Sequence, residues 1–177
     1  ILNNVDRYQV QIIYTQIDRD ANNFPTFRSY TYNLDTNLYY YPASAVKMPA
    51  AFLALEKLNQ IKVEGLSKYS PMHTGAGRPP QTTATVDTSA ENDQPSIAQY
   101  IKKIFLVSDN DAFNRLYEFL GQEYLNKQLW NKGYKRTRII HRLSVPGFDV
   151  ESNRYTNPIS FFDSLRNPIF QQGQVNS

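Results

Sequence analysis

Cysteine is absent from the 177 residues, which excludes disulfide bonds as a source of stability. Long hydrophobic runs are missing too, because charged residues or proline interrupt the apolar stretches well before a membrane-spanning length. A large excess of charge of one sign is missing as well: the chain has 19 Lys and Arg against 16 Asp and Glu, and the basic residues are scattered along the sequence. The composition therefore gives no support to a nucleic-acid partner. His73 has no second His or Cys near it, so we expect a surface residue there, no metal and no cofactor.

Aromatic residues are abundant, with ten Phe and thirteen Tyr, and 41% of all residues are hydrophobic. This content argues against disorder and provides material for one sizeable core. Near the N-terminus, residues 8–17 and 26–33 alternate in polarity on either side of a polar stretch at 18–23. The alternation predicts a β-hairpin, to which we assign no active role.

Residues 41–49 read Tyr-Pro-Ala-Ser-Ala-Val-Lys-Met-Pro and lead into an apolar helical run. Ser44 and Lys47 are three residues apart, so on a helix they share a face and lie within hydrogen-bonding reach. A Ser hydroxyl needs a neighbouring base to act as a nucleophile, and a buried Lys amine can lose its proton and serve as that base. The helix N-terminus also offers N–H groups to an oxyanion. The spacing predicts an activated nucleophile.

A second polar motif, Ser108-Asp109-Asn110, stands between two helical patterns. The first pattern begins at Ser96, which forms a capping-box signature with Gln99. The motif is therefore predicted to lie on a tight connection between two helices, where its hydroxyl and amide face a cleft.

The remaining segments are interpreted from periodicity and turn residues. Residues 61–94 are rich in Pro, Gly, Thr and Ser, which indicates a long surface excursion. Gly121 ends the helix after the second motif, and a further helix is expected over about 122–132. Another helix is expected over 159–165, followed by a frayed tail at 171–177. Five basic residues are expected to form a solvated face: Lys132, Lys135, Arg136, Arg138 and Arg142.

Together, the two motifs resemble those of the class A β-lactamase family and its relatives among penicillin-binding proteins and penicillin sensors. The resemblance rests on Tyr-Pro-Ala-Ser-x-x-Lys-x-Pro at 41–49, followed in the expected order by Ser-Asp-Asn-x-Ala-x-Asn at 108–114. It continues through Leu120-Gly121, Gly133 and Arg142-Leu143, and it can be followed from about residue 8 to residue 158.

The resemblance implies an α+β fold of the β-lactamase/DD-peptidase type. On this interpretation residues 1–177 form a single domain, with strands of a sheet in residues 1–40 and a mainly helical subdomain in residues 41–177. The third motif of the family, Lys-Thr-Gly on a late strand, does not occur in the sequence. We therefore expect an amino-terminal part of a longer protein. The open edge of an incomplete sheet would be completed by the missing C-terminal fragment or by a second copy.

The resemblance also implies roles for single residues. Ser44 would be the acylated nucleophile and Lys47 its general base. Ser108 would relay a proton to the leaving nitrogen, and Asn110 would hydrogen-bond the amide of the substrate.

Asn114 would support the loop that follows Arg142-Leu143. In class A β-lactamases this loop carries a Glu, in an E-x-x-L-N pattern, that activates the deacylating water. The pattern is not found here. Asp149 and Glu151 are the candidates for a water-activating group, at a spacing that departs from the family.

Three functions remain open at this point. The first is a serine hydrolase that opens β-lactams or a related amide or ester through an acyl-enzyme. The second is a penicillin-binding sensor or a peptidoglycan DD-peptidase whose acyl-enzyme is long-lived, and the third is a non-catalytic homologue. The resemblance implies a small-molecule β-lactam or peptidoglycan-peptide substrate and a periplasmic or secreted location, with no signal peptide in these residues.

Overall fold

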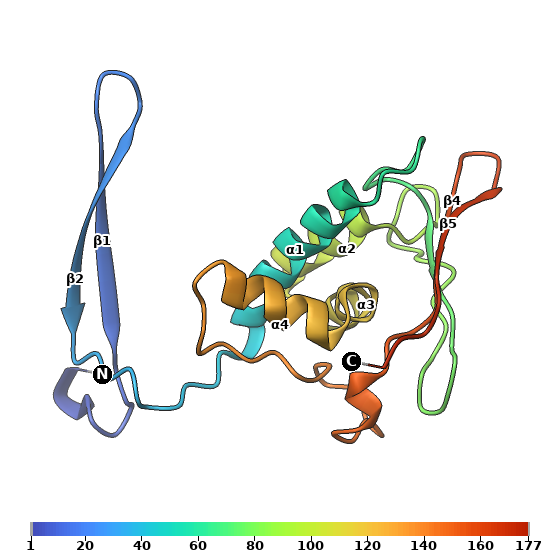
Figure 1. The fold of residues 1–177 in the computed structure, drawn as a ribbon. Coiled ribbons are helices and arrows are strands. Elements are labelled where there is room, and N and C mark those ends of the chain that lie inside the picture. The colour runs from blue at the N-terminus through green and yellow to red at the C-terminus, as the bar shows by residue number, and fades with distance from the viewer. Residues whose placement is uncertain (1, 177) are drawn as a thin grey trace. The chain divides into compact units, whose positions relative to one another are not determined.

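The computed structural model describes residues 2–176, and the chain divides into two compact units, Ile1–Tyr41 and Pro42–Ser177 (Figure 1). Within the described residues, the first unit is a β-hairpin and the second combines α-helices with a small antiparallel sheet. This mixed content confirms the predicted α+β class. A single domain over residues 1–177 stays a prediction. None of the helices in the described part of the chain is long and apolar enough to cross a membrane.

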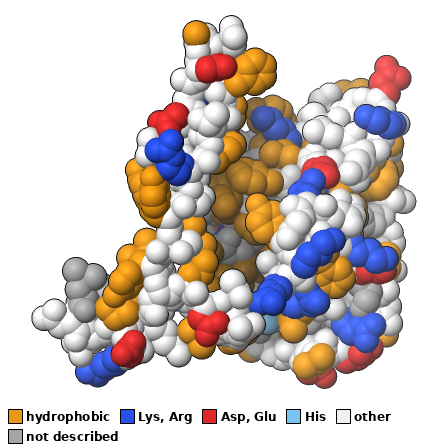
Figure 2. Space-filling view, turned by 60° about the vertical axis from the view of Figure 1, so that its left-hand side comes forward, with side chains coloured by type: hydrophobic (Ala, Val, Ile, Leu, Met, Phe, Trp, Pro, Cys, Tyr) orange, Lys and Arg blue, Asp and Glu red, His pale blue; other side chains and the backbone are white. Residues whose placement is uncertain are grey.

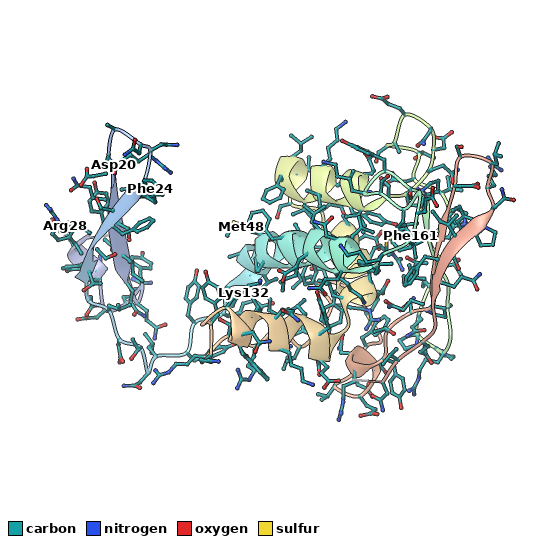
Figure 3. All side chains as sticks on the ribbon, turned by 45° about the horizontal axis from the view of Figure 1, so that its top comes forward. Asp20, Phe24, Arg28, Met48, Lys132 and Phe161 are labelled. Atoms are coloured by element: carbon teal, nitrogen blue, oxygen red, sulfur yellow. The ribbon has the colours of Figure 1, made fainter. Side chains whose placement is uncertain are left out.

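The first unit begins with a short 3₁₀ turn, η1 (Leu2–Asn4), and continues into two antiparallel strands. These are β1 (Ile12–Arg19) and β2 (Pro25–Tyr32), which pair along their full length. The predicted hairpin is confirmed, although β1 begins at Ile12 because residues 5–9 form turns. At the tip of the hairpin, Asp20 Oδ1 accepts the backbone N–H of Phe24 at 2.9 Å and holds the connection closed (Figure 3).

Apolar side chains cover both faces of the hairpin (Figure 2). Six of them, three on each face by the strand register, are at least 50% exposed: Ile13, Ile17 and Phe27 on one face, and Tyr14, Tyr30 and Tyr32 on the other. A two-stranded hairpin alone is marginally stable in water. The hairpin therefore lacks a core of its own and depends on burial of these faces.

Helices form the centre of the second unit. Those described are α1 (Lys47–Gln60), α2 (Ile97–Val107), α3 (Asn110–Leu120) and α4 (Gln122–Asn131), and the helices predicted in these regions are confirmed. Helix α3 is central because it packs against both α1 and α2, and Phe113, Leu116 and Phe119 are fully buried (Figure 1). Gly121 joins α3 to α4 with φ of 78°, which favours glycine.

The sheet of the second unit has the strand order β3-β4-β5, antiparallel throughout. Its strands are β3 (Met72–Thr74), β4 (Ile159–Phe162) and β5 (Pro168–Gln172). The helix predicted over 159–165 is therefore wrong. Ile159 and Phe161 are fully buried whereas the residues between and after them are half-buried, which is the two-residue period of a strand. The Phe161 ring packs edge-on against Phe119 of α3, with 5.5 Å between the ring centres (Figure 3).

Two other expectations about loops are corrected. The tail predicted to fray is tied to the body up to residue 176, because Thr156 N–H donates to the Val175 carbonyl at 2.9 Å and Thr156 Oγ1 accepts from Val175 N–H at 2.8 Å. Residue 177 lies outside the described residues. The 61–94 excursion is not wholly at the surface, since Met72 on β3 is fully buried, and His73 is half-buried beside Phe162.

Arg142 does not belong to the solvated basic face, although the other four predicted members are exposed. Its guanidinium is buried, and its Nε donates to Glu118 Oε1 at 2.8 Å. Glu118, on α3, also accepts from Arg115 Nη1 at 3.1 Å. Burial raises the pKa of the Glu118 carboxyl, against the opposing charges of both arginines. The Glu118 carboxylate thus contacts both buried cations, and Arg115 has a second, exposed partner in Asp111 at 3.1 Å.

Removing the charge of Glu118 is expected to destabilise the second unit strongly. Glu118→Gln leaves the buried guanidinium of Arg142 without its anion and leaves Arg115 only the exposed Asp111, and breaking such a buried pair costs about 3 to 5 kcal/mol. Urea unfolding followed by circular dichroism measures the change. The matched control is Glu123→Gln, which breaks the exposed pair with Lys127 and is expected to leave the midpoint unchanged. Equal midpoints for the two variants would contradict this account of the core.

Lys57 connects three elements of the second unit. From α1, its Nζ donates to the Phe119 carbonyl at the end of α3 and to Gln172 Oε1 on β5, the latter at 2.7 Å. The amine also lies 4.5 Å from the centre of the Phe119 ring. Burial lowers the pKa of Lys57 to about 8. Below that pH the amine is charged and buried, and the loss of its hydration destabilises the folded state.

Stability is therefore expected to rise with pH between about 8 and 9.5. The folded-state pKa of Lys57 lies below its unfolded value, so the unfolded chain binds more protons in this window and the free energy of unfolding increases. The rise should be on the order of 1 to 2 kcal/mol. Denaturant titrations at several pH values measure it, with Lys57→Met as the comparison. A slope that persists unchanged in Lys57→Met would assign the effect to another group.

Candidate active site

The segment that carries the nucleophile is a 3₁₀ turn, η2 (Ala43–Val46), which runs directly into α1. Ala43 has a φ of 45°, a strained value for a residue with a Cβ, and it sets the chain into the turn. Buried Val46 and Ala50 anchor the turn in the core. As a result the Ser44 side chain is exposed, whereas Lys47 is only 2% exposed.

The Ser108-Asp109-Asn110 motif lies on the connection between α2 and α3, as predicted. Ser108 ends α2 in the left-handed conformation, with φ of 54° and ψ of 43°. Asp109 is the N-cap of α3, where its Oδ1 accepts the Ala112 N–H at 2.8 Å. A left-handed non-glycine residue costs about 1 to 3 kcal/mol, and such residues concentrate at functional sites.

The Lys47 amine joins the two motifs. Its Nζ lies 3.1 Å from Ser44 Oγ, 3.0 Å from Ser108 Oγ and 2.6 Å from Asn110 Oδ1, and it also donates to the Ser108 carbonyl. An ammonium group has only three protons to donate to these four oxygens, so it cannot donate a separate hydrogen bond to each of them. When the amine is neutral, its lone pair can accept the proton of Ser44. The structure thus brings Ser44, Lys47, Ser108 and Asn110 into one cluster.

The electrostatics of the cluster favour a neutral amine. Burial lowers the pKa of Lys47, and the negative charge of Asp109 opposes this shift in part. Lowering the pKa increases the fraction of amine that can take a proton near neutral pH. The arrangement can therefore activate a hydroxyl nucleophile for attack on a carbonyl carbon.

Asn114 links α3 to the loop after Arg142. Its Nδ2 donates to the Leu143 carbonyl at 2.9 Å, and its Oδ1 accepts the Leu143 N–H at 2.7 Å. The paired amide contacts fix the start of the loop against the helix that begins at Asn110. The sequence interpretation placed Asn114 in this supporting position.

Asp149 and Glu151 are exposed and are not part of the Lys47 cluster. Asp149 Oδ1 accepts the N–H of Ser152 at 2.7 Å, and Ser152 is the first residue of the 3₁₀ turn η3 (Ser152–Arg154). Hydrogen bonds from the side chain and from the backbone N–H of Ser152 hold the pKa of Asp149 below its usual range. A carboxylate whose pKa is lowered in this way is a weak base. The water-activating role of Asp149 or Glu151 stays a prediction.

One part of the site is absent from the sequence interpretation. Lys103 on α2 lies between Asp87 and Asp109, with its Nζ 3.3 Å and 3.7 Å from their carboxylate oxygens. Periodicity places Lys103 on a helix, but it gives no sign of the left-handed Ser108 that turns Asp109 back toward it. The sequence signal that could have pointed to this part of the site is Asp109 itself, because Asp is a typical N-cap residue at the start of a helix.

The comparisons with known proteins concern the family of the chain. In the described residues, no group of three or more His, Cys, Asp and Glu could hold a metal ion. Among curated proteins, none matches the chain. The model of the β-lactamase enzyme family matches residues 2–168, a range that includes the hairpin, both motifs and β4. The mixed α+β architecture is compatible with that fold. Because the match covers most of the sequence, the chain belongs to the β-lactamase enzyme family.

Proposed function

We propose that the chain carries the active site of a serine hydrolase that forms an acyl-enzyme at Ser44 with β-lactams or a related amide or ester. The observation that carries the proposal is the buried Lys47 amine, which contacts Ser44 Oγ, Ser108 Oγ and Asn110 Oδ1 at the same time. Membership of the β-lactamase enzyme family supports the same class of reaction.

In the proposed reaction, the neutral Lys47 amine accepts the Ser44 proton while Ser44 Oγ attacks the carbonyl carbon. The Oγ–C bond forms, and collapse of the tetrahedral intermediate then breaks the C–N bond. The proton passes from Lys47 through the Ser108 hydroxyl, 3.0 Å away, to the leaving nitrogen. Asn110 Oδ1 accepts from Lys47, which leaves the Asn110 Nδ2 to donate to the amide of the substrate.

A second candidate is a binding protein or peptidase whose acyl-enzyme persists. The observation that favours it is the exposed position of Asp149 and Glu151, together with the hydrogen bond that Asp149 accepts from the Ser152 N–H. If neither carboxylate activates a water, acylation proceeds and release is slow. The substrate is then a β-lactam or a peptidoglycan peptide, and the family resemblance supports a periplasmic or secreted location for either candidate.

Mixing the protein with a penicillin is expected to add the mass of the drug to Ser44. Intact-mass spectrometry over time measures the adduct, and Ser44→Ala should remain unmodified because it has no hydroxyl to acylate. Ser29→Ala, an exposed serine of the hairpin, is the matched control and should react like the wild type. An adduct that disappears as hydrolysed drug accumulates favours the hydrolase, and a lasting adduct favours the second candidate. An adduct that also forms on Ser44→Ala would overturn the assignment of the nucleophile.

The general-base role of Lys47 is tested by a pair of substitutions. Lys47→Met removes the amine, and Lys47→Arg keeps a cation that cannot give up its proton. Both are expected to slow acylation about 100-fold or more, which is the usual contribution of a positioned base. Stopped-flow measurement with a chromogenic β-lactam gives the rate. Near-wild-type acylation by Lys47→Arg would show that positive charge suffices and that Lys47 is not the base.

A further inference from the structure

Asp109 has two effects on the Lys47 cluster. Its Oδ1 caps α3 and so fixes the start of the helix that carries Asn110 and Asn114. Its negative charge also favours the protonated form of the Lys47 amine. The first effect assembles the site, whereas the second works against a general base. A group that keeps the cap and offsets the charge would therefore improve the site.

Lys103 is placed to keep Asp109 in its capping position and to offset its negative charge. Its Nζ lies 3.7 Å from Asp109 Oδ2, the carboxylate oxygen that does not cap the helix. The Lys103 backbone carbonyl also accepts the Asp109 N–H at 3.4 Å, so one residue holds Asp109 from two sides. These contacts span the left-handed Ser108, whose carbonyl accepts from Lys47.

Asp87 fixes the Lys103 amine from the other side. Its Oδ2 lies 3.3 Å from Lys103 Nζ, and its Oδ1 accepts from the Ser89 N–H at 3.0 Å. Although burial alone would raise the pKa of Asp87, hydrogen bonds from Ser89 and the charge of Lys103 hold it below its usual range. The 61–94 excursion thus supplies an ionised carboxylate that orients Lys103 toward the active-site turn.

We propose that Lys103 is a positioning residue of the active site: it holds Asp109 on the Ser108 turn and offsets its negative charge, so that the Lys47 amine gives up its proton more readily. The inference rests on the proposed function of Lys47 as general base. It extends the site from the two motifs to α2 and to the excursion before it.

The charged groups around this arrangement are few. Asp109 is the charged group whose field acts on Lys47. Asp111, in the first turn of α3, pairs instead with Arg115 at 3.1 Å. Lys103 meets Asp87 from the excursion and Asp109 from the turn. The chain also offers a matched control, because Lys102 is adjacent on the same helix and exposed.

The test is a pH titration of the Lys47 amine by nuclear magnetic resonance, on the full chain labelled with ¹³C at the lysine ε-carbons. Lys47→Arg identifies the resonance. In Lys103→Met the titration midpoint is expected to rise by about 0.5 to 1 pH unit, because the Asp109 charge is no longer offset. In Lys102→Met it should stay at the wild-type value. Lys103→Gln serves the same purpose if Lys103→Met does not fold.

A double variant separates charge from structure. Asp109→Asn keeps an oxygen for the cap but removes the charge, so adding Lys103→Met to it should give a smaller shift than in the wild-type background, because only the charge of Lys103 is then lost and no carboxylate is released. The acylation rate should follow the same pattern. In Lys103→Met the rate should be lower than in the wild type at neutral pH and should return to the wild-type value at high pH. A merely structural loss would lower the rate equally at every pH. An unchanged midpoint in Lys103→Met, or a shift of undiminished size in the Asp109→Asn background, would overturn the proposal. Failure of the proposed function appears separately, as a wild-type protein that forms no penicillin adduct.

Discussion

The contact of the Lys47 amine with two distant segments is the constraint on which the rest of the second unit depends. Ser44 comes from the turn before α1, whereas Ser108 and Asn110 come from the connection between α2 and α3. To hold a buried amine between them, the chain must pack α1 against both later helices, and it does so through α3, which is buried from Ala112 to Leu120. Burial of this one cation is unfavourable for its charged form, and the same burial gives it the properties of a base.

The interior of this unit contains other charges that are handled differently. Arg115, Glu118 and Arg142 compensate one another, so their burial builds structure without leaving a free proton acceptor. Lys57 is satisfied by carbonyl oxygens at the junction of α1, α3 and β5. Lys47, by contrast, faces hydroxyl and amide groups at an exposed turn, where a substrate can reach its partners. The difference in partners, rather than burial alone, distinguishes Lys47, the candidate active-site lysine, from Lys57.

Much of this organisation could be predicted from local sequence. The hairpin follows from alternation, the helices from periodicity, and the meeting of Ser44 with Lys47 from a spacing of three residues. The wrong predictions concern features that depend on residues distant in the sequence. A strand at 159–162 depends on pairing with β3 and on the Phe119 ring, and the burial of Arg142 depends on Glu118. The Lys103 contacts depend on the left-handed conformation of Ser108, which cannot be predicted from the sequence because residues other than glycine rarely adopt it.

The central claim is that Ser44 Oγ attacks a carbonyl carbon beside Lys47 and Ser108. The most direct measurement is a crystal structure of the protein reacted with a boronic acid analogue of a penicillin, since boron forms a tetrahedral adduct that mimics the attacked carbonyl. The account predicts a bond from boron to Ser44 Oγ, with Lys47 Nζ and Ser108 Oγ still in hydrogen-bonding contact. A boron bound elsewhere, or no adduct in a folded protein, would contradict it.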